Sequence, residues 1–349
     1  MNIRNRKAEH IDICLNEKIA PGYRYWDDVK LVHNALPEID AEEIDTSITL
    51  FGKKLEFPMI VTAITGGFEG AEKINGNIAE ACADLGIGMG IGSERAGVMG
   101  IEPKSYSIVK EYDVPLMIGN VGAPQLVPQH SKDFIGSDEI EAARDLVDAD
   151  VVAIHLNYLQ EAIQPEGDTN AKGCHEAIRN LAREYPLIIK ETGAGISREV
   201  AERLKGIGIL GIDVAGMGGT SFSAVEMYRA REIKDEVLAE MGETFFDWGI
   251  PTPVSLIDAK CGLPLIASGG ILNGVHVANS IALGAGCAGV AYAILREAMV
   301  SADAVKKRLE IIREELKIAM LLTGCSDIKQ LSNARHVILG KTAQWLEGL

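Results

Sequence analysis

The stretch Ala149-Asp150-Val151-Val152-Ala153-Ile154 is short, apolar and β-branched, and it gives way at once to His155-Leu156-Asn157-Tyr158-Leu159-Gln160-Glu161. The first part predicts a buried strand, because β-branched side chains pack well in sheets. Imidazole, carboxamide and carboxylate groups then follow where that strand ends. In parallel α/β proteins, ligands bind at the carboxyl ends of the strands. The stretch therefore predicts a parallel α/β fold with a functional loop at this point.

Similar short apolar runs recur along the chain and alternate with helical segments. The eight predicted strands are Pro58–Ala63, Gly86–Ile91, Val114–Ile118, Asp150–Ile154, Pro186–Lys190, Ile209–Val214, Pro264–Ala267 and Ala288–Ala291, and amphipathic helices are predicted at Ala71–Leu85, Ser137–Val147, Cys174–Glu184 and Gly274–Leu283. A doubly wound open sheet is the alternative, but its ligands gather at one switch point. Small and polar residues follow all eight runs here, so we predict a (β/α)₈ TIM barrel.

Three segments lie outside the eight predicted units. Residues 1–57 form an amino-terminal extension whose last part, Ile44–Phe57, predicts a hairpin that plugs the amino-terminal mouth of the barrel. Residues 216–261 are a long insertion after the sixth strand, with a helical stretch at Ser223–Met241, and are a candidate lid or subunit contact. The amphipathic stretch Ala302–Leu322 predicts a scaffold helix. We expect residues 1–349 to form one domain.

Composition and charge restrict the class of protein. The chain has 34 basic and 50 acidic residues, a formal net charge of -16, which argues against general affinity for nucleic acid or anionic membranes. Its six cysteines form no CxxC pair, which favours reduced thiols. Neither a signal-peptide core nor a run of about 18 apolar residues is found. We expect a cytoplasmic enzyme with a local basic pocket for any anionic substrate.

The glycine-rich segment Ser268-Gly269-Gly270 follows the seventh predicted strand, and Ala291-Tyr292 ends the eighth. Barrels often bind phosphate through backbone N–H groups of these two loops. Read without its position, Ser-Gly-Gly is most often a turn. Its place after the seventh strand favours a phosphate site.

Lys190 and Glu161 each allow two interpretations. Lys190 ends the apolar fifth strand, where it suits Schiff-base chemistry or the electrostatic stabilisation of an electron-rich cofactor. Glu161 is either a solvated loop carboxylate or a ligand of Mg²⁺, an ion that takes one or two protein carboxylates and completes its shell with water and substrate phosphate. The density of polar groups around Glu161 favours the metal.

Arg6, Lys7 and His10 precede every predicted element, and such termini are usually frayed. They could also fold over the barrel and neutralise a phosphorylated substrate, with Arg95 as a second contact. Small residues in Thr62–Gly67 and Gly218–Thr220 leave space for a flat ring. Tight turns are the alternative for those glycines.

Taken together and in order, these motifs resemble the type 2 isopentenyl-diphosphate isomerases, FMN-dependent barrel enzymes of isoprenoid synthesis, and in particular archaeal-like members. The resemblance covers nearly the whole chain through Arg6–His10, Leu31–Glu38, Thr65–Gly67, His155–Glu161 with Pro165–Asp168, Lys190-Glu191, Asp213–Gly216 with Gly218–Thr220, Trp248–Thr252 and Ser268–Gly270. No single glycine motif decides the resemblance, because the ordered set carries it.

The resemblance implies a role for individual residues. Flavin ring and ribityl contacts fall on Ala63, Ile64, Thr65, Ser93, Asn120, Lys190 and Thr220, and flavin phosphate contacts on Gly269, Gly270, Ala291 and Tyr292. Substrate contacts fall on Arg6, Lys7, His10, Ser93, Glu94, Arg95, Asn157 and Gln160, the Mg²⁺ ligand is Glu161, and the catalytic candidates are Gln160, His155 and Lys190. The implied reaction interconverts isopentenyl and dimethylallyl diphosphate on reduced FMN, with NADPH as reductant, in a homo-oligomer (tetramer or octamer).

Three positions depart from the family pattern. Ile64 replaces a methionine, Glu94 replaces a glutamine and adds a negative charge, and Leu272 stands where an arginine is common. The alternative enzyme is an FMN-dependent 2-hydroxy-acid oxidase or dehydrogenase, which needs a base histidine near the last strands. Here the available histidine, His276, lies inside a predicted helix, which argues against that enzyme.

Overall fold

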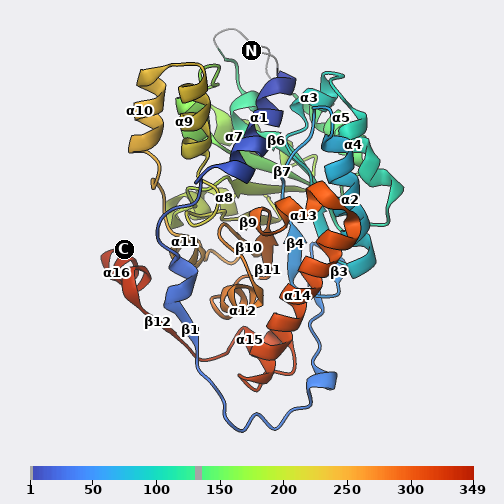
Figure 1. The fold of residues 1–349 in the computed structure, drawn as a ribbon, viewed down its shortest axis with the longest axis vertical. Coiled ribbons are helices and arrows are strands. Elements are labelled where there is room, and N and C mark those ends of the chain that lie inside the picture. Colours follow the sequence, from blue (N-terminus) through green and yellow to red (C-terminus); the bar gives the residue numbers. More distant parts are fainter. Residues whose placement is uncertain (1–2, 130–135) are drawn as a thin grey trace.

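The computed structural model describes residues 3–129 and 136–349, and its centre is a closed barrel of parallel strands (Figure 1). Met1 and Asn2 of the predicted polar terminus lie outside the described residues. The barrel strands are β4 (Met59–Val61), β5 (Gly88–Gly90), β6 (Met117–Gly122), β7 (Val151–Leu156), β8 (Leu187–Glu191), β9 (Gly211–Asp213), β10 (Leu265–Ser268) and β11 (Cys287–Val290). They pair in chain order, and β11 closes the barrel on β4. The predicted (β/α)₈ barrel is confirmed.

Strands β6 and β7 continue beyond their predicted ends. Their register runs from Ile118↔Val151 to Gly122↔His155, five parallel pairs in all. The sequence places a boundary at the first polar residue, whereas the backbone ladder continues through Asn120 and His155. Both polar side chains therefore project from regular strands, which position side chains more rigidly than loops do.

Helices surround the barrel and follow the predicted pattern in most places. They are α1 (Ile3–Asn16), α2 (Ala71–Leu85), α3 (Arg95–Val98), α4 (Lys104–Ser107), α5 (Ser137–Val147), α6 (Tyr158–Ile163), α7 (Cys174–Leu181), α8 (Arg198–Lys205), α9 (Phe222–Glu232), α10 (Glu236–Thr244), α11 (Thr252–Asp258), α12 (Gly274–Ala282), α13 (Leu295–Val300), α14 (Ala302–Leu321), α15 (Ile328–Leu331) and α16 (Gly340–Gly348). The scaffold helix α14 packs against α2 and α12. Among the described residues, no helix is long and apolar enough for a membrane span.

The helical stretch predicted at Ser223–Met241 is two helices and not one. Helix α9 ends before Lys234, which has a left-handed φ of 60°, and the Asp235 side chain then accepts a hydrogen bond from the Leu238 N–H to cap α10. A non-glycine residue in this region interrupts a helix. The sequence of this stretch contains no glycine or proline that would mark the break.

The predicted hairpin consists of β2 (Ile48–Leu50) and β3 (Lys53–Leu55). Leu50 and Leu55 are buried in one cluster with the barrel-interior side chains of Ile60, Ile118 and Ile188. The hairpin thus packs against the interior end of the barrel opposite to the strand ends that carry polar residues.

Both termini contain regular structure that the sequence pattern did not indicate. Arg6, Lys7 and His10 belong to helix α1 rather than to a frayed segment, which corrects the placement of these residues before any element. Strand β1 (Val29–Leu31) pairs antiparallel with β12 (His336–Ile338), so that segments from the two ends of the chain lie side by side (Figure 1). Three-residue strands are too short to show a period of two.

Candidate active site

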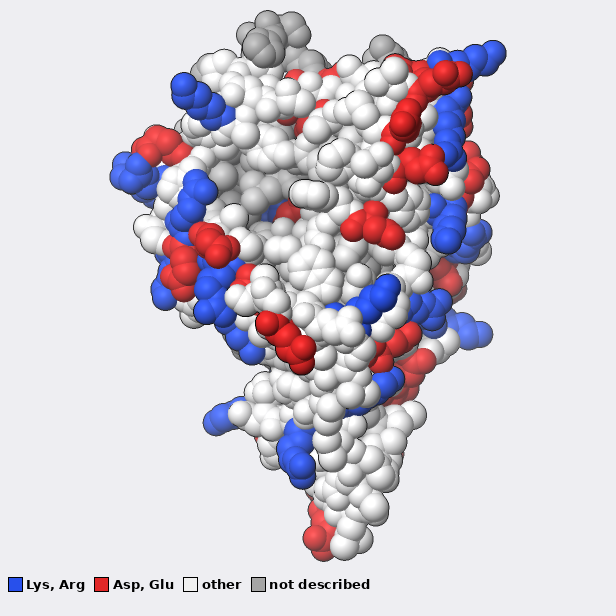
Figure 2. Space-filling model, turned by 90° about the vertical axis from the view of Figure 1, so that its left-hand side faces the viewer, with Lys and Arg blue, Asp and Glu red and all other residues white. Residues whose placement is uncertain are grey.

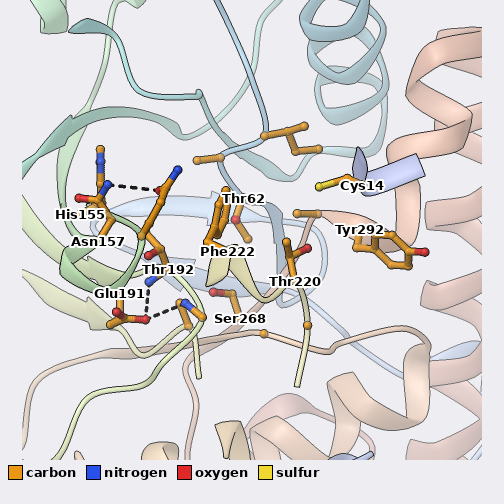
Figure 3. A pocket seen from close by; sticks show the side chains of 18 of the residues that line it. Cys14, Thr62, His155, Asn157, Glu191, Thr192, Thr220, Phe222, Ser268 and Tyr292 are labelled. Atoms are coloured by element: carbon orange, nitrogen blue, oxygen red, sulfur yellow. Dashed lines mark hydrogen bonds between the residues drawn. The ribbon is translucent and has the colours of Figure 1, made fainter. Parts of the chain in front are cut away.

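A cavity of about 460 Å³ opens at the carboxyl ends of the barrel strands. Its volume is in the range of small-molecule and cofactor sites. Every predicted site residue except Glu94 lines it: Arg6, Lys7, His10, Ala63, Ile64, Thr65, Ser93, Arg95, Asn120, His155, Asn157, Gln160, Glu161, Lys190, Thr220, Gly269, Gly270, Ala291 and Tyr292. Figure 3 shows His155 and Asn157 on one side of the cavity and Tyr292 on the other, with Thr220 and Ser268 between them.

The loop after β10 requires glycine at two consecutive positions. Gly269 and Gly270 have φ of 100° and 78°, and a Cβ on Gly269 would lie 2.4 Å from the Gly216 carbonyl oxygen. The Gly269 carbonyl accepts hydrogen bonds from Trp26 Nε1 at 2.9 Å and from Thr252 Oγ1 at 2.8 Å. These two side-chain donors hold the Gly269 carbonyl in place. A backbone without Cβ atoms suits close approach by an anionic group such as phosphate.

Lys190 lies at the end of β8 with two acidic neighbours, Glu191 and Asp213. Burial lowers the pKa of Lys190, while the charges of Asp213 and Glu191 raise it. Glu191 Oε2 accepts backbone N–H bonds from residues 192, 193 and 194 at 2.6, 2.6 and 2.5 Å. Burial nevertheless raises the pKa of Glu191 to about 7. The base of the cavity therefore holds a lysine whose charge depends on the carboxylates around it.

His155 and Asn120, on neighbouring strands, form a buried polar pair. The distance from His155 Nδ1 to Asn120 Oδ1 is 2.8 Å. Since Asn120 Oδ1 is an acceptor, His155 Nδ1 carries the proton and its Nε2 is left as an acceptor. Burial lowers the pKa of His155 well below 6.5, and the positive charges of Lys190 and Lys7 lower it further. The imidazole is neutral at physiological pH.

The prediction that Glu94 contacts substrate disagrees with its position. Glu94 is fully buried and does not line the cavity, and its Oε2 accepts a hydrogen bond from the Asn120 N–H at 2.6 Å. Burial raises the pKa of Glu94 to about 8, so its proton is retained near neutral pH. The extra acidic group therefore supports the Asn120 backbone and adds little negative charge.

We expect His155 to make stability depend on pH. Its pKa is lowered in the folded protein, so the unfolded chain binds more protons as pH falls below about 6.5. The contribution to the free energy of unfolding is complete above that pH and declines below it. Urea unfolding of H155Q should show a flatter pH dependence than the native chain, and proton NMR should show no His155 titration from about pH 8 to about pH 6. Titration of His155 near pH 6.5 would contradict the neutral assignment.

Glu161 is a buried carboxylate that lines the cavity. Its Oε1 accepts from Asn157 Nδ2 at 2.9 Å, and its Oε2 accepts from Gln164 Nε2 at 2.5 Å and the Asp168 N–H at 2.7 Å. A carboxylate has about four lone-pair positions, so one stays available for a cation. No cluster of three or more His, Cys, Asp or Glu side chains suited to a metal occurs in the described residues. A single carboxylate fits Mg²⁺ that is completed by substrate phosphate and water.

Helix α1 brings basic residues to the opening of the cavity. Lys7 Nζ donates hydrogen bonds to the Ser93 carbonyl at 2.7 Å and to the Tyr106 hydroxyl at 2.6 Å. Burial lowers the pKa of Lys7 to about 7. Arg6 lies 3.4 Å from a Glu166 oxygen. Basic and acidic side chains are interspersed on the face in Figure 2. We therefore expect the positive charge for an anionic substrate to come from residues at the cavity itself, such as Arg6 and Lys7.

Sequence reasoning missed the residues that hold α1 against the insertion. Glu226 and Arg229, on α9, are fully or almost fully buried and form an ion pair at 2.5 Å. Glu226 also lies 3.0 Å from His10 Nε2 and accepts a hydrogen bond from Gln160 Nε2 at 3.0 Å. In the sequence these residues stand among many charged neighbours of a helix. Only their three-residue spacing hinted at one shared helix face.

Comparison with known proteins identifies the family. An isopentenyl-diphosphate delta-isomerase of Thermoplasma acidophilum is 45% identical over 347 residues, which cover 99% of this chain and 99% of that protein. An isopentenyl-diphosphate delta-isomerase of Archaeoglobus fulgidus is 44% identical over 351 residues, with the same coverage of both chains. The chain belongs to the type 2 isopentenyl-diphosphate delta-isomerases. The predicted resemblance is confirmed.

A family model and two solved structures also resemble this isomerase. Residues 170–338 match the family model of FMN-dependent dehydrogenase. A mandelate oxidase structure has a TM-score of 0.61 at 18% identity and covers 96% of this chain and 98% of its own. A mandelate oxidase structure with benzoyl-formic acid has a TM-score of 0.60 at 18% identity, with 95% of this chain and 94% of its own covered. These likenesses concern the fold alone.

The histidine required by the alternative oxidase is engaged in structural contacts. His276 lies on α12, stacks on Trp26, and accepts at Nδ1 from the Leu272 N–H at 3.3 Å. Its Nε2 lies 3.2 Å from Asp27 Oδ1. With both ring nitrogens occupied, His276 is poorly placed to act as a base, although it lines the cavity.

Proposed function

We propose that the chain interconverts isopentenyl diphosphate and dimethylallyl diphosphate by moving a double bond, with FMN and Mg²⁺ bound in the cavity of about 460 Å³. The observation that carries the proposal is the convergence in this one cavity of a glycine cradle, a half-buried lysine, a neutral histidine and a buried carboxylate. The identity to archaeal isomerases over the whole chain supports the substrate.

The residues present fit FMN. Gly269 and Gly270 offer backbone without Cβ atoms for its phosphate, and Lys190, Thr65 and Asn120 line the adjacent space for its ring and ribityl chain. When bound and reduced, with NADPH as the reductant, the flavin supplies an electron-rich group that exchanges protons and stabilises positive charge. The isomerisation itself involves no net oxidation or reduction.

The chain's own residues anchor and orient the substrate. Arg6, Lys7 and Arg95 would neutralise the diphosphate, and Glu161 would hold Mg²⁺, which would supply further positive charge for it. Binding energy from the diphosphate then fixes the short hydrocarbon chain in place, which lowers the entropic part of the barrier. Neutral His155 and the carboxamide of Gln160 line the same cavity and are suited to hold protons in position.

Conversion of isopentenyl to dimethylallyl diphosphate, assayed with and without FMN, NADPH and Mg²⁺, tests the proposal. We expect turnover only when all three are present and a yellow protein after incubation with FMN. A colourless protein that takes up no FMN would refute the proposal. Oxidation of lactate or glycolate with release of peroxide would instead favour the alternative oxidase.

We also propose that the chain forms a homo-oligomer in the cytoplasm. The insertion leaves three large apolar side chains of its outer part exposed, Val237 at 69%, Met241 at 37% and Trp248 at 61%. An apolar surface of this kind is suited to a subunit contact. The role of the insertion as a lid or a contact stays a prediction, which size determination in solution would test.

A further inference from the structure

A small second cavity, of about 10 Å³, lies in the barrel interior and shares Lys190 with the large one. Asp213 lines the small cavity and does not line the large one. Lys190, like Thr62, Ala63 and Asn120, lines both cavities, so it borders the proposed flavin site as well as the cavity that Asp213 lines. A volume of this size is at the lower limit for one water molecule.

Asp213 is a buried carboxylate with one oxygen satisfied and one not. Its Oδ1 accepts hydrogen bonds from Ser268 Oγ at 2.6 Å, the Ser268 N–H at 3.3 Å and the Ala215 N–H at 3.2 Å. Its Oδ2 has no hydrogen-bond partner among the described residues, and the side chain is 1% exposed. A buried polar atom without a partner is costly, so its presence indicates a role.

The register of the barrel places Asp213 beside one particular cation. Lys190 on β8 and Asp213 on β9 are directly paired residues of adjacent parallel strands. Both line the small cavity, which has room for a single bridging water. The only hydrogen bond of Lys190 Nζ within the described residues is to the Glu191 carbonyl at 3.3 Å, which leaves two of its three donors.

We infer that Asp213 is a positioning residue for Lys190, whose ammonium group it holds at the base of the flavin site across a cavity with room for one water. The inference rests on the proposed function, since it takes the large cavity as the FMN site. Burial favours the neutral amine of Lys190, and the negative charges of Asp213 and Glu191 oppose that effect. The positive charge of Lys190 also lowers the pKa of His155.

The sign of the shift in the flavin midpoint potential distinguishes a positioning role of Asp213 from a direct action of Asp213 on the flavin. A charged Lys190 stabilises the electron-rich reduced flavin, so loss of that charge makes the midpoint potential more negative. If Asp213 instead acted directly on the flavin, removal of its negative charge would make the potential more positive. D213N keeps the shape of the side chain and therefore separates the two.

Measurements of FMN affinity and midpoint potential on purified protein reconstituted with FMN would test the inference. D213N should bind oxidised FMN within about threefold of the native affinity, and its midpoint potential should become more negative. In a K190M background, D213N should shift the potential in the positive direction, because only the direct effect is left. D258N is the matched control, since Asp258 is a mostly buried carboxylate on α11 that pairs with Arg198 and does not line either cavity.

A second measurement distinguishes failure of the inference from failure of the proposed function. In protein without flavin, the amine of Lys190 is dimethylated with ¹³C-labelled reagent and titrated by NMR. We expect D213N to lower the pKa of Lys190, and S268A, which removes one hydrogen bond to Asp213, to lower it less. An unchanged Lys190 titration in both variants, or a positive potential shift in D213N alone, overturns the inference. Failure of the native chain to bind FMN refutes the proposed function and leaves this titration valid.

Discussion

E161Q should lose most of the Mg²⁺-dependent binding of the diphosphate and keep its FMN. Glu161 is 5% exposed and lines the cavity, and it is the carboxylate that we propose as the metal ligand. Loss of one partner of a buried charge interaction costs about 2–5 kcal/mol. We therefore expect KM for isopentenyl diphosphate to rise at least about thirtyfold, since 1.4 kcal/mol is tenfold. Steady-state kinetics at several Mg²⁺ concentrations measure this change.

The neutral side chain of E161Q retains one acceptor oxygen for the bonds from Gln164 and the Asp168 N–H. Flavin uptake should for this reason be unchanged, and the visible spectrum reports it. E176Q is the control, because Glu176 is an exposed carboxylate on α7 that pairs with Arg179, and its kinetics should match the native protein. Native Mg²⁺ dependence in E161Q would contradict the metal assignment. Loss of flavin together with activity would indicate a structural role instead.

The barrel was predictable from the sequence because each strand is a short apolar run that ends in polar or small residues. That pattern depends only on local order, and it identified all eight strands and the polar or small residues that follow them. Boundaries were less accurate where the ladder continues through polar residues. Asn120 and His155 read as loop residues in the sequence, yet their backbones pair with neighbouring strands.

Contacts between distant segments were not predictable, because no local pattern reports them. Arg6, Lys7 and His10 look like a frayed basic terminus, but contacts from distant segments hold them in a docked helix. Glu226 of α9 lies beside His10, Glu166 lies beside Arg6, and the Ser93 carbonyl accepts a hydrogen bond from Lys7. Glu94 illustrates the converse case. The family resemblance implied a substrate contact for Glu94, but its side chain extends to the Asn120 backbone and is fully buried.

R229M should destabilise the docked position of α1 much more than removal of an exposed charge on α9. Arg229 is 2% exposed at its side chain and lies 3.0 Å from Glu9, 3.3 Å from Glu166 and 2.5 Å from Glu226. Without it, Glu226 loses a cation while remaining buried. Removal of one partner from a buried pair costs about 3–5 kcal/mol. Urea unfolding should show this loss, and trypsin should cut earlier at the amino-terminal helix.

The pH dependence of the same variant separates electrostatics from lost packing. Burial would raise the pKa of Glu226, but hydrogen bonds and charges from His10, Arg229 and Gln160 hold it at about 2. A lowered folded pKa contributes stability above the ordinary value of 4.5, and this contribution is lost as pH falls toward 2. R229M raises the pKa of Glu226. The loss in free energy of unfolding relative to the native chain should therefore become smaller as the pH falls. R231M is the control on the same helix, where an exposed pair with Glu243 is expected to contribute less than about 1 kcal/mol. Equal stability of R229M and R231M at neutral pH would mean that the buried cluster does not hold α1 over the cavity.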